Sequence, residues 1–516
     1  MKRIKRPISL VLVFLTVFSS FLILPSELFH STYVKAAEIF SSVGTESTEI
    51  YTTDDFTYKL IEDNSKVEIV SYIGSSSEVI IPDRIEAKKV VSIGNKAFSE
   101  KAITSVTFGD FVEKIDSYAF YHCESLAKVD FAESNVKTIG DYAFARISSL
   151  EKIVFPDSVE TIGNYAFNPY SNGSYYDYVK SGLKSITFGT GIKSIGNSAF
   201  RKLESLETVV FKGSNLESIG SYAFYNCELI TDIKLKGNNA KIGSCAFEYC
   251  YGLNSVELSG SFNSIGSHAF DGCSKLTSFD MGDSVVTVND YAFSNCTSLE
   301  SIELSDSLTT IGSQAFYNCK KITSINIPDG VASIPSNAFY NCYALKSVSI
   351  GSGCTSISAS AFDGTNALEA FIVSENNTTY SSVDGVLFNK DKSTLVLCPR
   401  GFSGSYTIPD TVTAISDYAF DSCQNLTAVT MGNSIESIGV EAFYNCDKIQ
   451  SYDLPDSLKS IGLNAFRDSN ALTSVSFGSG LETVGRYAFY GCGKLESVEI
   501  NSTNLSLAHC KMKLKQ

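Results

Sequence analysis

The sequence predicts a repeat solenoid, mainly β, in which coils of about 23 residues stack on one another. Ala-Phe recurs sixteen times in phase, and most steps between successive repeat phenylalanines are 23 residues long. Other apolar residues hold nearly fixed positions within each step. Such a period is typical of solenoids, because one unit cannot bury its own apolar face and must stack on its neighbours. The repeat therefore overrides the roughly two to four globular domains that this length would otherwise suggest.

Each unit has the same order of expected elements. In one of them, residues 302–304 alternate apolar and polar, which is the period-2 pattern of a half-buried strand. Residues 305–307 (Ser-Asp-Ser) predict a turn, and residues 308–311 a second short strand. Gly312 permits a tight corner, and residues 315–318 have room for about one helical turn. We expect each strand to pair in parallel with the same strand of the next coil.

Two steps depart from the period. The step after Phe167 is ten residues too long, and residues 170–178 predict a loop extruded from one coil. The step after Phe362 is 58 residues long and contains Asp384-Gly385 between short apolar stretches. This pair predicts a variant coil that bears a hairpin. We expect the rod to stay continuous there, with room for a local bend.

The N-terminus has the order of a secretory signal peptide. Four basic residues among the first six precede an apolar run from Ile8 to Leu24. Small residues then offer a cleavage site, which we place after Ala36. An uncleaved anchor helix is the alternative, although the run is only marginally long enough to span a membrane. In either case we expect the rest of the chain to lie outside the cytoplasm.

The chain is acidic. Removing residues 1–36 changes its formal net charge from −15 to −19. An acidic protein is repelled by nucleic acid and by anionic membranes. No second apolar stretch is long enough to span a membrane. We therefore expect no nucleic-acid partner, and no membrane insertion once the signal peptide is removed.

The consensus Cys-x-x-Leu-x-x-Ile-x-Leu-Pro-x-x-Leu-x-x-Ile-Gly-x-x-Ala-Phe-x-x closely resembles the BspA-like class of bacterial leucine-rich repeats. The likeness covers nearly all of residues 81–500, and residues 382–391 and 398–401 also look like pieces common in that family. The resemblance implies a secreted or cell-surface protein that binds other proteins, often in host attachment. It brings no catalytic residues with it. We therefore expect a protein-binding scaffold, with adhesion to host or matrix proteins as its role, and not an enzyme.

With this family in view, the chain divides into six segments. They are a signal peptide (1–36), an N-terminal β cap (37–92), a leucine-rich repeat solenoid (93–367), a variant hairpin-bearing coil (368–410), a second stretch of leucine-rich repeat solenoid (411–500) and a C-terminal tail (501–516). The cap is expected because a bare solenoid end exposes apolar surface and an unpaired strand edge.

Most of the fourteen cysteines belong to the repeat. Side chains at one repeat position point the same way, whereas a disulfide needs Cβ atoms that converge. We therefore predict a ladder of small buried thiols in place of a disulfide framework. The ten ladder cysteines, each three residues after a repeat phenylalanine, are Cys123, Cys227, Cys250, Cys273, Cys296, Cys319, Cys342, Cys423, Cys446 and Cys492.

No cofactor or metal site is expected. The histidines that remain after signal removal are His122, His268 and His509. We find no histidine, cysteine or carboxylate at convincing metal-ligand spacing from them. No triad of nucleophile and base, and no carboxylate pair outside the repeat pattern, stands out either.

Two features are candidates for ligand binding. Tyrosines flank Ala-Phe in many units; as an exposed ladder they would stack on glycan, and otherwise they cover the corner with their hydroxyls in water. The other candidate is the outward position of the first strand, where small and acidic side chains give a flat, negative face. Its predicted ligand-binding residues are Glu257, Asp280, Glu303 and Asn326. Ordinary solvation explains this row as well as a binding site does. The partner expected is an extracellular or host protein, with a glycan as the alternative.

Overall fold

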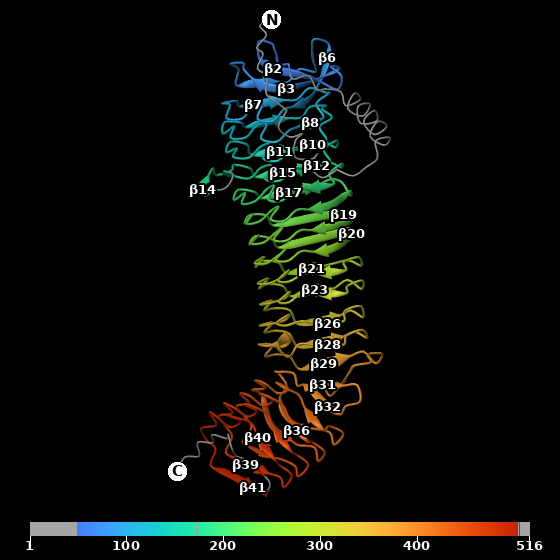
Figure 1. Cartoon of the computed structure of the whole chain (residues 1–516), viewed down its shortest axis with the longest axis vertical. Coiled ribbons are helices and arrows are strands. Elements are labelled where there is room, and N and C mark those ends of the chain that lie inside the picture. Colours follow the sequence, from blue (N-terminus) through green and yellow to red (C-terminus); the bar gives the residue numbers. More distant parts are fainter. Residues whose placement is uncertain (1–48, 172–173, 504, 506–516) are drawn as a thin grey trace, which may run out of the picture.

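The computed structural model describes residues 49–171, 174–503 and 505, which form a long rod of stacked coils (Figure 1). A regular coil contributes a first strand, a turn, a second strand and a corner that carries Ala-Phe. Equivalent strands of successive coils pair in parallel, as Ser278–Asp280 does with Ser301–Glu303. The predicted parallel β-solenoid is therefore confirmed.

The first strands form one long face of the rod. Their side chains alternate between solvent and core, because successive residues of a strand point to opposite faces. Two strands, β19 and β20, run through both strand positions of their coils. The row consists of β4 (Glu78–Ile80), β7 (Ser105–Thr107), β9 (Lys128–Asp130), β11 (Lys152–Val154), β15 (Ser185–Phe188), β17 (Thr208–Phe211), β19 (Asp232–Ile242), β20 (Ser255–Ile265), β21 (Ser278–Asp280), β23 (Ser301–Glu303), β25 (Ser324–Ile327), β27 (Ser347–Ile350), β29 (Ala370–Val373), β33 (Gly404–Thr407), β35 (Leu426–Thr430), β37 (Ser451–Asp453), β39 (Ser474–Phe477) and β41 (Ser497–Ile500).

The second strands form a narrower row, and most are two residues long. Nearly all of them place an isoleucine or valine in the core. The row consists of β6 (Lys88–Ile93), β8 (Lys114–Ile115), β10 (Thr138–Ile139), β12 (Thr161–Ile162), β16 (Ser194–Ile195), β18 (Leu216–Ile219), β22 (Thr287–Val288), β24 (Thr310–Ile311), β26 (Ser333–Ile334), β28 (Ser356–Ile357), β34 (Ala414–Ile415), β36 (Ser437–Ile438), β38 (Ser460–Ile461) and β40 (Thr483–Val484).

The Ala-Phe corner is a series of turns, where the sequence suggested a helical turn. In one coil, the residues two before and two after Phe270 have positive φ: 56° at His268 and 76° at Gly272. Left-handed residues so close together cannot continue a right-handed helix. The Phe270 amide instead donates to the carbonyl of Ala292 in the next coil, at 2.8 Å. Among the described residues, helix is confined to the short 3₁₀ element η2 (Ala359–Phe362).

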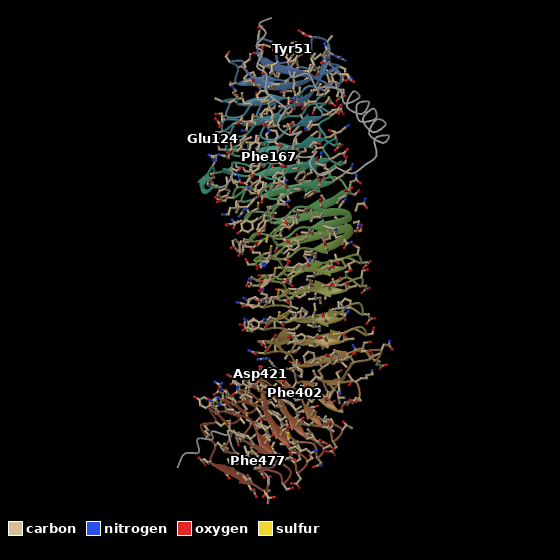
Figure 2. All side chains as sticks on the ribbon, viewed as in Figure 1. Tyr51, Glu124, Phe167, Phe402, Asp421 and Phe477 are labelled. Atoms are coloured by element: carbon tan, nitrogen blue, oxygen red, sulfur yellow. The ribbon has the colours of Figure 1, made fainter. Side chains whose placement is uncertain are left out.

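The repeat phenylalanines form the spine of the core; one of them, Phe167, is labelled in Figure 2. Phe270 is fully buried, and its ring stacks on Phe247 and Phe293 at centroid distances of 5.3 and 5.4 Å. The same stacking continues without a gap from Phe98 to Phe362. Each regular coil thus adds a buried aromatic ring to one continuous stack.

Glycine is required at the corner because the backbone of the preceding coil lies too close for a Cβ atom, and not because the turn needs a positive φ. A Cβ atom on Gly266 would lie 2.5 Å from the carbonyl carbon of Gly243, one coil earlier. Neither glycine has positive φ. The glycine column therefore lets consecutive backbones approach closely, whereas the sequence had suggested that glycine was needed for a tight corner.

The ladder cysteines are buried free thiols. In nine of the ten, the thiol donates to the carbonyl of the repeat phenylalanine in the preceding coil, at 3.0–3.3 Å. Cys423 differs because its preceding coil is the irregular one, and it faces the carbonyls of Cys398 and Pro399. Ser469 occupies the same position in its coil and donates to Phe443 at 3.1 Å. The position thus accepts a small hydrogen-bond donor in most coils, whereas in two coils the buried apolar residues Ile147 and Leu203 occupy it.

An antiparallel sheet covers the N-terminal end of the rod. Strands β1 (Tyr51–Thr52), β2 (Phe56–Ile61) and β3 (Lys66–Tyr72) pair antiparallel, and β3 then pairs in parallel with β6. A short strand, β5 (Arg84–Ile85), pairs antiparallel with β6. The ring of Tyr72 stacks on Phe98 at 5.3 Å and so extends the phenylalanine spine into this sheet.

The predicted signal peptide and most of the C-terminal tail, including Cys510 and His509, lie outside the described residues. Within the described part of the chain, no helix has the length and apolar character that a membrane span requires. The extra residues after Phe167 form an antiparallel pair, β13 (Tyr170–Ser171) and β14 (Ser174–Tyr178), where a loop was predicted. This hairpin projects from the side of the rod (Figure 1).

The rod bends at the irregular coil (Figure 1). Strands β30 (Tyr380–Val383), β31 (Val386–Asn389) and β32 (Thr394–Leu397) pair antiparallel, and β32 then resumes parallel pairing with β34. The predicted Asp384-Gly385 turn joins β30 to β31, with positive φ at both residues. Buried residues form two clusters that meet at this coil. The phenylalanine spine resumes at Phe420 in the second cluster.

One arginine bridges the two sides of the bend. Arg400, which follows β32, forms ion pairs with Asp363 and Asp421. Both aspartates directly follow a repeat phenylalanine, Asp363 before the bend and Asp421 after it. The arginine side chain is only 14% exposed. It therefore ties together the last coil before the bend and the first regular coil after it.

Candidate binding surface

The four residues predicted to bind a ligand lie on the outward side of the first strand row. Glu257 on β20, Asp280 on β21 and Glu303 on β23 are direct register partners. All three side chains are exposed, while their inward neighbours Phe279 and Ile302 are buried. The period-2 pattern thus placed these carboxylates correctly in the fold.

Asn326 occupies the next outward position, but across a break. Its strand β25 belongs to a different hydrogen-bonded sheet from β23. Asn326 pairs with Ser349 on β27, and Ser349 pairs in turn with Ile372 on β29. The three carboxylates therefore lie on one continuous sheet, and we call them the acidic strip (Glu257, Asp280, Glu303). Asn326 lies on the first strand of the following sheet.

The carboxylates of the acidic strip have different surroundings. Lys234, one coil earlier, forms an ion pair with Glu257 at 2.7 Å and lowers the pKa of that carboxyl through the hydrogen bond and the charge. Asp280 accepts a hydrogen bond from the Gly282 amide at 2.8 Å, so it also closes a turn. Together with Lys234, the strip carries a formal charge of about −2 on a fully hydrated surface.

The same outward row carries exposed apolar residues that sequence reasoning missed. Val154 and Val210 are 43% and 42% exposed, and both pair in register with Thr187 on β15. Ile372 is 55% exposed at the corresponding position before the bend. The signal was present as unbroken apolar runs, such as Val209-Val210-Phe211, in which the expected alternation fails. The face thus combines β-branched and acidic stretches.

The tyrosine columns stack on themselves. Tyr142 lies between Tyr118 and Tyr165, with centroid distances of 4.8 Å on both sides and nearly parallel rings. Tyr317 and Tyr340 stack in the same way at 5.2 Å. A sugar binds an aromatic residue through the face of the ring, and here those faces are covered by neighbouring tyrosines. Their edges and hydroxyls remain for contact with solvent.

A groove of about 480 Å³ lies where the rod bends. It is lined on one side by Ile357 to Ala359 and on the other by residues of β32, β34 and β36 and by the residues that follow β34, including Asp417. Strand β28 does not pair with β32, and the groove occupies this gap in the second strand row. Sequence reasoning did not predict it, because it depends on how the two halves of the rod meet.

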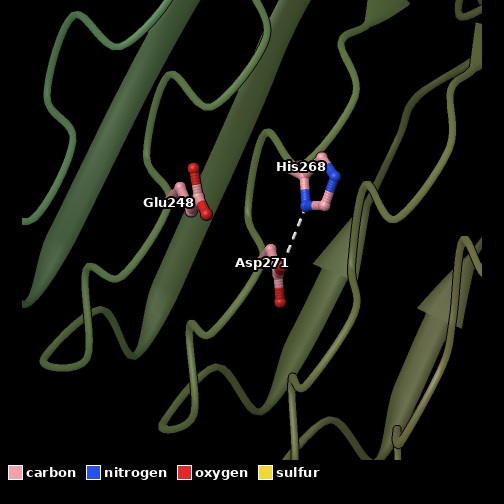
Figure 3. A group of neighbouring side chains, drawn as sticks. All are labelled: Glu248, His268 and Asp271. Atoms are coloured by element: carbon pink, nitrogen blue, oxygen red, sulfur yellow. Dashed lines mark hydrogen bonds and ion pairs between the residues drawn. The ribbon is translucent and has the colours of Figure 1, made fainter.

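A second polar cluster lies at the Ala-Phe corner of two adjacent coils (Figure 3). Glu248, His268 and Asp271 each place one potential ligand atom within 4.8 Å of the others. His268 Nδ1 lies 2.9 Å from the Asp271 carboxylate. Glu248 and Asp271 are 8% and 6% exposed. The expectation that no carboxylate lies at ligand spacing from His268 is not met, because Asp271 is three residues away and Glu248 is one coil before Asp271.

Comparison with known proteins gives one family match. A family described as the BspA type leucine rich repeat region (6 copies) matches residues 72–176, 171–297, 263–390 and 403–510, which together are most of the chain. No curated protein matches the sequence.

Several solved structures are similar. A leucine-rich repeat protein from Bacteroides ovatus is 23% identical, with a TM-score of 0.43 over 87% of this chain and 94% of that one. One from Eubacterium ventriosum is 21% identical, with a TM-score of 0.34 over 68% and 81% of the two chains. A leucine rich cell surface protein from Faecalibacterium prausnitzii is 20% identical, with a TM-score of 0.30 over 89% and 96%.

Proposed function

The chain belongs to the BspA-type leucine-rich repeat family, and from this premise we propose that it is a scaffold that binds other proteins. We place it at the cell surface or outside the cell, where the N-terminal sequence would direct it. Its role would be adhesion to a host or matrix protein. Function in this proposal comes from a surface that many coils share.

The observation that carries the proposal is the outward row of the first strands. Equivalent residues repeat in register along the rod, about 4.8 Å apart. A solenoid of this kind offers an extended surface on which a partner contacts several coils at once. The acidic strip would attract a basic partner and raise its association rate, while Val154 and Val210 offer apolar contacts on the same row, nearer the N-terminus.

Glycan binding by the tyrosine columns is the alternative. It has less support, because stacking of Tyr142 between Tyr118 and Tyr165 occupies the ring faces that a sugar would need. Tyrosines at the ends of such stacks keep one face available.

A pull-down against purified extracellular matrix proteins, run beside a glycan array with residues 37–516, tests the proposal. We expect a matrix protein with a basic surface to be captured, with weaker capture at high salt. Binding to glycans with no protein captured would contradict the proposal and support the alternative.

A further inference from the structure

The two coils that hold Glu248, His268 and Asp271 depart from the tyrosine pattern of the corner. Tyrosine recurs two residues before and one residue after the repeat phenylalanine, as in Tyr222 and Tyr225. The next two coils have Cys245 and Glu248, then His268 and Asp271, at these positions. Four side chains able to bind metal thus replace four tyrosine positions in consecutive coils.

The two carboxylates of the cluster are nearly buried and lack a strong counter-charge. Glu248 and Asp271 are equivalent residues of adjacent coils, so parallel stacking places them next to each other. Among the described residues, neither carboxylate forms an ion pair with a lysine or arginine. The ion pair that Asp271 does form is with His268. A bound cation would compensate carboxylates removed from water in this way, because burial of uncompensated charge is costly.

Neighbouring side chains hold the donor atoms in place. Asn318 donates to Asn295 at 3.0 Å, and Asn295 donates to the second oxygen of Asp271 at 3.0 Å. The ring of His268 stacks on Tyr291 at 4.5 Å, with the planes nearly parallel. Such outer contacts orient metal ligands in known metal sites.

The donor set suits a particular class of ion. One imidazole and two carboxylates favour Zn²⁺ or a similar divalent transition metal, whereas Ca²⁺ prefers oxygen ligands alone. Two ligands of one tetrahedral Zn²⁺ ion, each bound at about 2.0–2.2 Å, lie roughly 3.4 Å apart. His268 Nδ1 and the Asp271 oxygen lie 2.9 Å apart, so a small rotation of either side chain would bring them to this separation. A bound ion would replace the hydrogen bond between them.

We propose that Glu248, His268 and Asp271 bind one divalent transition-metal ion, of which Zn²⁺ fits best, and that this ion links two consecutive coils. Cys245, which lies in reach of Glu248, or water would complete the coordination. The His268 side chain is 36% exposed, which gives the ion a path from solvent. Ligands from two coils would resist separation of the coils, so binding would stabilise the fold.

Titration of the metal-free mature chain with ZnCl₂ tests the proposal, by calorimetry for stoichiometry and by thermal unfolding for stability. His268→Tyr is the first variant, because Tyr222 and Tyr291 occupy the same position with similar positive φ. Asp271→Asn and Glu248→Gln keep shape while removing charge. His122→Tyr is the matched control, since His122 pairs only with the exposed Glu124.

We expect one Zn²⁺ per chain, a rise in Tm with ZnCl₂, and at least tenfold weaker binding in the three cluster variants, with His122→Tyr unchanged. Each variant is first checked for wild-type Tm in EDTA, so that loss of binding is separated from loss of fold. No saturable binding by the wild type below about 100 µM, or equal binding by His268→Tyr, would overturn the proposal. Binding of CaCl₂ as tight as ZnCl₂ would overturn the assignment of the ion.

Discussion

The ladder cysteines act as hydrogen-bond donors inside the core. Each thiol of a regular coil reaches back to a phenylalanine carbonyl of the preceding coil, as Cys296 does to Phe270 at 3.2 Å. Ser469 makes the same contact with a hydroxyl donor, whereas Ile147 and Leu203 occupy the equivalent position in two coils without any donor. A buried carbonyl that loses a donor loses stability.

Replacing Cys296 by serine and by alanine separates the contribution of the hydrogen-bond donor to stability from the contribution of side-chain volume. Both side chains are smaller than cysteine, but only serine keeps a donor for the Phe270 carbonyl. We expect Cys296→Ser to be more stable than Cys296→Ala by about 1 kcal/mol in urea unfolding. Equal stability of the two would show that the thiol merely fills space.

Burial should also suppress thiol chemistry. It raises the pKa of Cys250 and Cys342 to about 12, so both stay protonated at neutral pH. We expect iodoacetamide at pH 8 to leave these residues unlabelled in the native protein and to label them after unfolding without reductant. Mass spectrometry that found them blocked in the unfolded, unreduced protein would contradict the free ladder.

The phenylalanine spine supplies a large buried side chain in each regular coil. Phe270→Ala should lower the free energy of unfolding by about 3–5 kcal/mol, because the fixed neighbouring coils cannot collapse into the cavity. Phe111→Ala is the control, since Phe111 lies at the surface beneath Arg84 and Lys89; its expected cost is about 1 kcal/mol. Similar costs for the two substitutions would mean that the spine is not the core.

Among the candidate site residues, the sequence correctly predicted exposure where the alternation within a single strand determines it. Alternation along single strands placed Glu257, Asp280 and Glu303 on the exposed face. It could not show that Asp280 closes a turn, or that Glu248 lies beside His268, because those contacts depend on side-chain rotamers and on the alignment of two coils.

At the scale of elements, the Asp384-Gly385 hairpin was predictable because its two residues favour positive φ at a two-residue turn. The prediction of a helical turn at the Ala-Phe corner was wrong. A segment of four or five residues has the same composition whether it forms a helical turn or contains a residue of positive φ that prevents one. Asparagine, which tolerates positive φ, recurs two residues after the phenylalanine and was the available signal.

Arg400 is the charged contact that joins elements on the two sides of the bend. Arg400→Met would leave Asp363 and the largely buried Asp421 without their cation, at a cost of about 3–5 kcal/mol. We expect the residues after the bend to unfold at lower urea concentration, and solution scattering to detect a changed bend angle. Arg467→Met is the control, because its pair with Asp468 is more exposed and should contribute about 1 kcal/mol or less. Unfolding of Arg400→Met at the wild-type midpoint would contradict this role.

At the scale of the whole molecule, the repeat period gave the solenoid and its parallel pairing, but not the shape of the rod. The direction of the second part depends on β30 to β32, where antiparallel pairing interrupts the stack and divides the buried residues into two clusters. Such a change in direction depends on long-range packing, which a local pattern does not encode. The face that we assign to binding lies along this rod and depends on many coils remaining in register.

The association rate of a captured partner is the most direct test of that assignment. Glu257→Lys, Asp280→Lys and Glu303→Lys, combined in one chain, reverse the acidic strip. Glu133→Lys, Glu369→Lys and Glu496→Lys, also combined, give the same change in net charge at dispersed exposed sites. We predict several-fold slower association for the strip variant than for the dispersed variant at low salt, and a smaller difference at high salt. Equal association rates of the two variants at low salt would contradict a binding role for the strip.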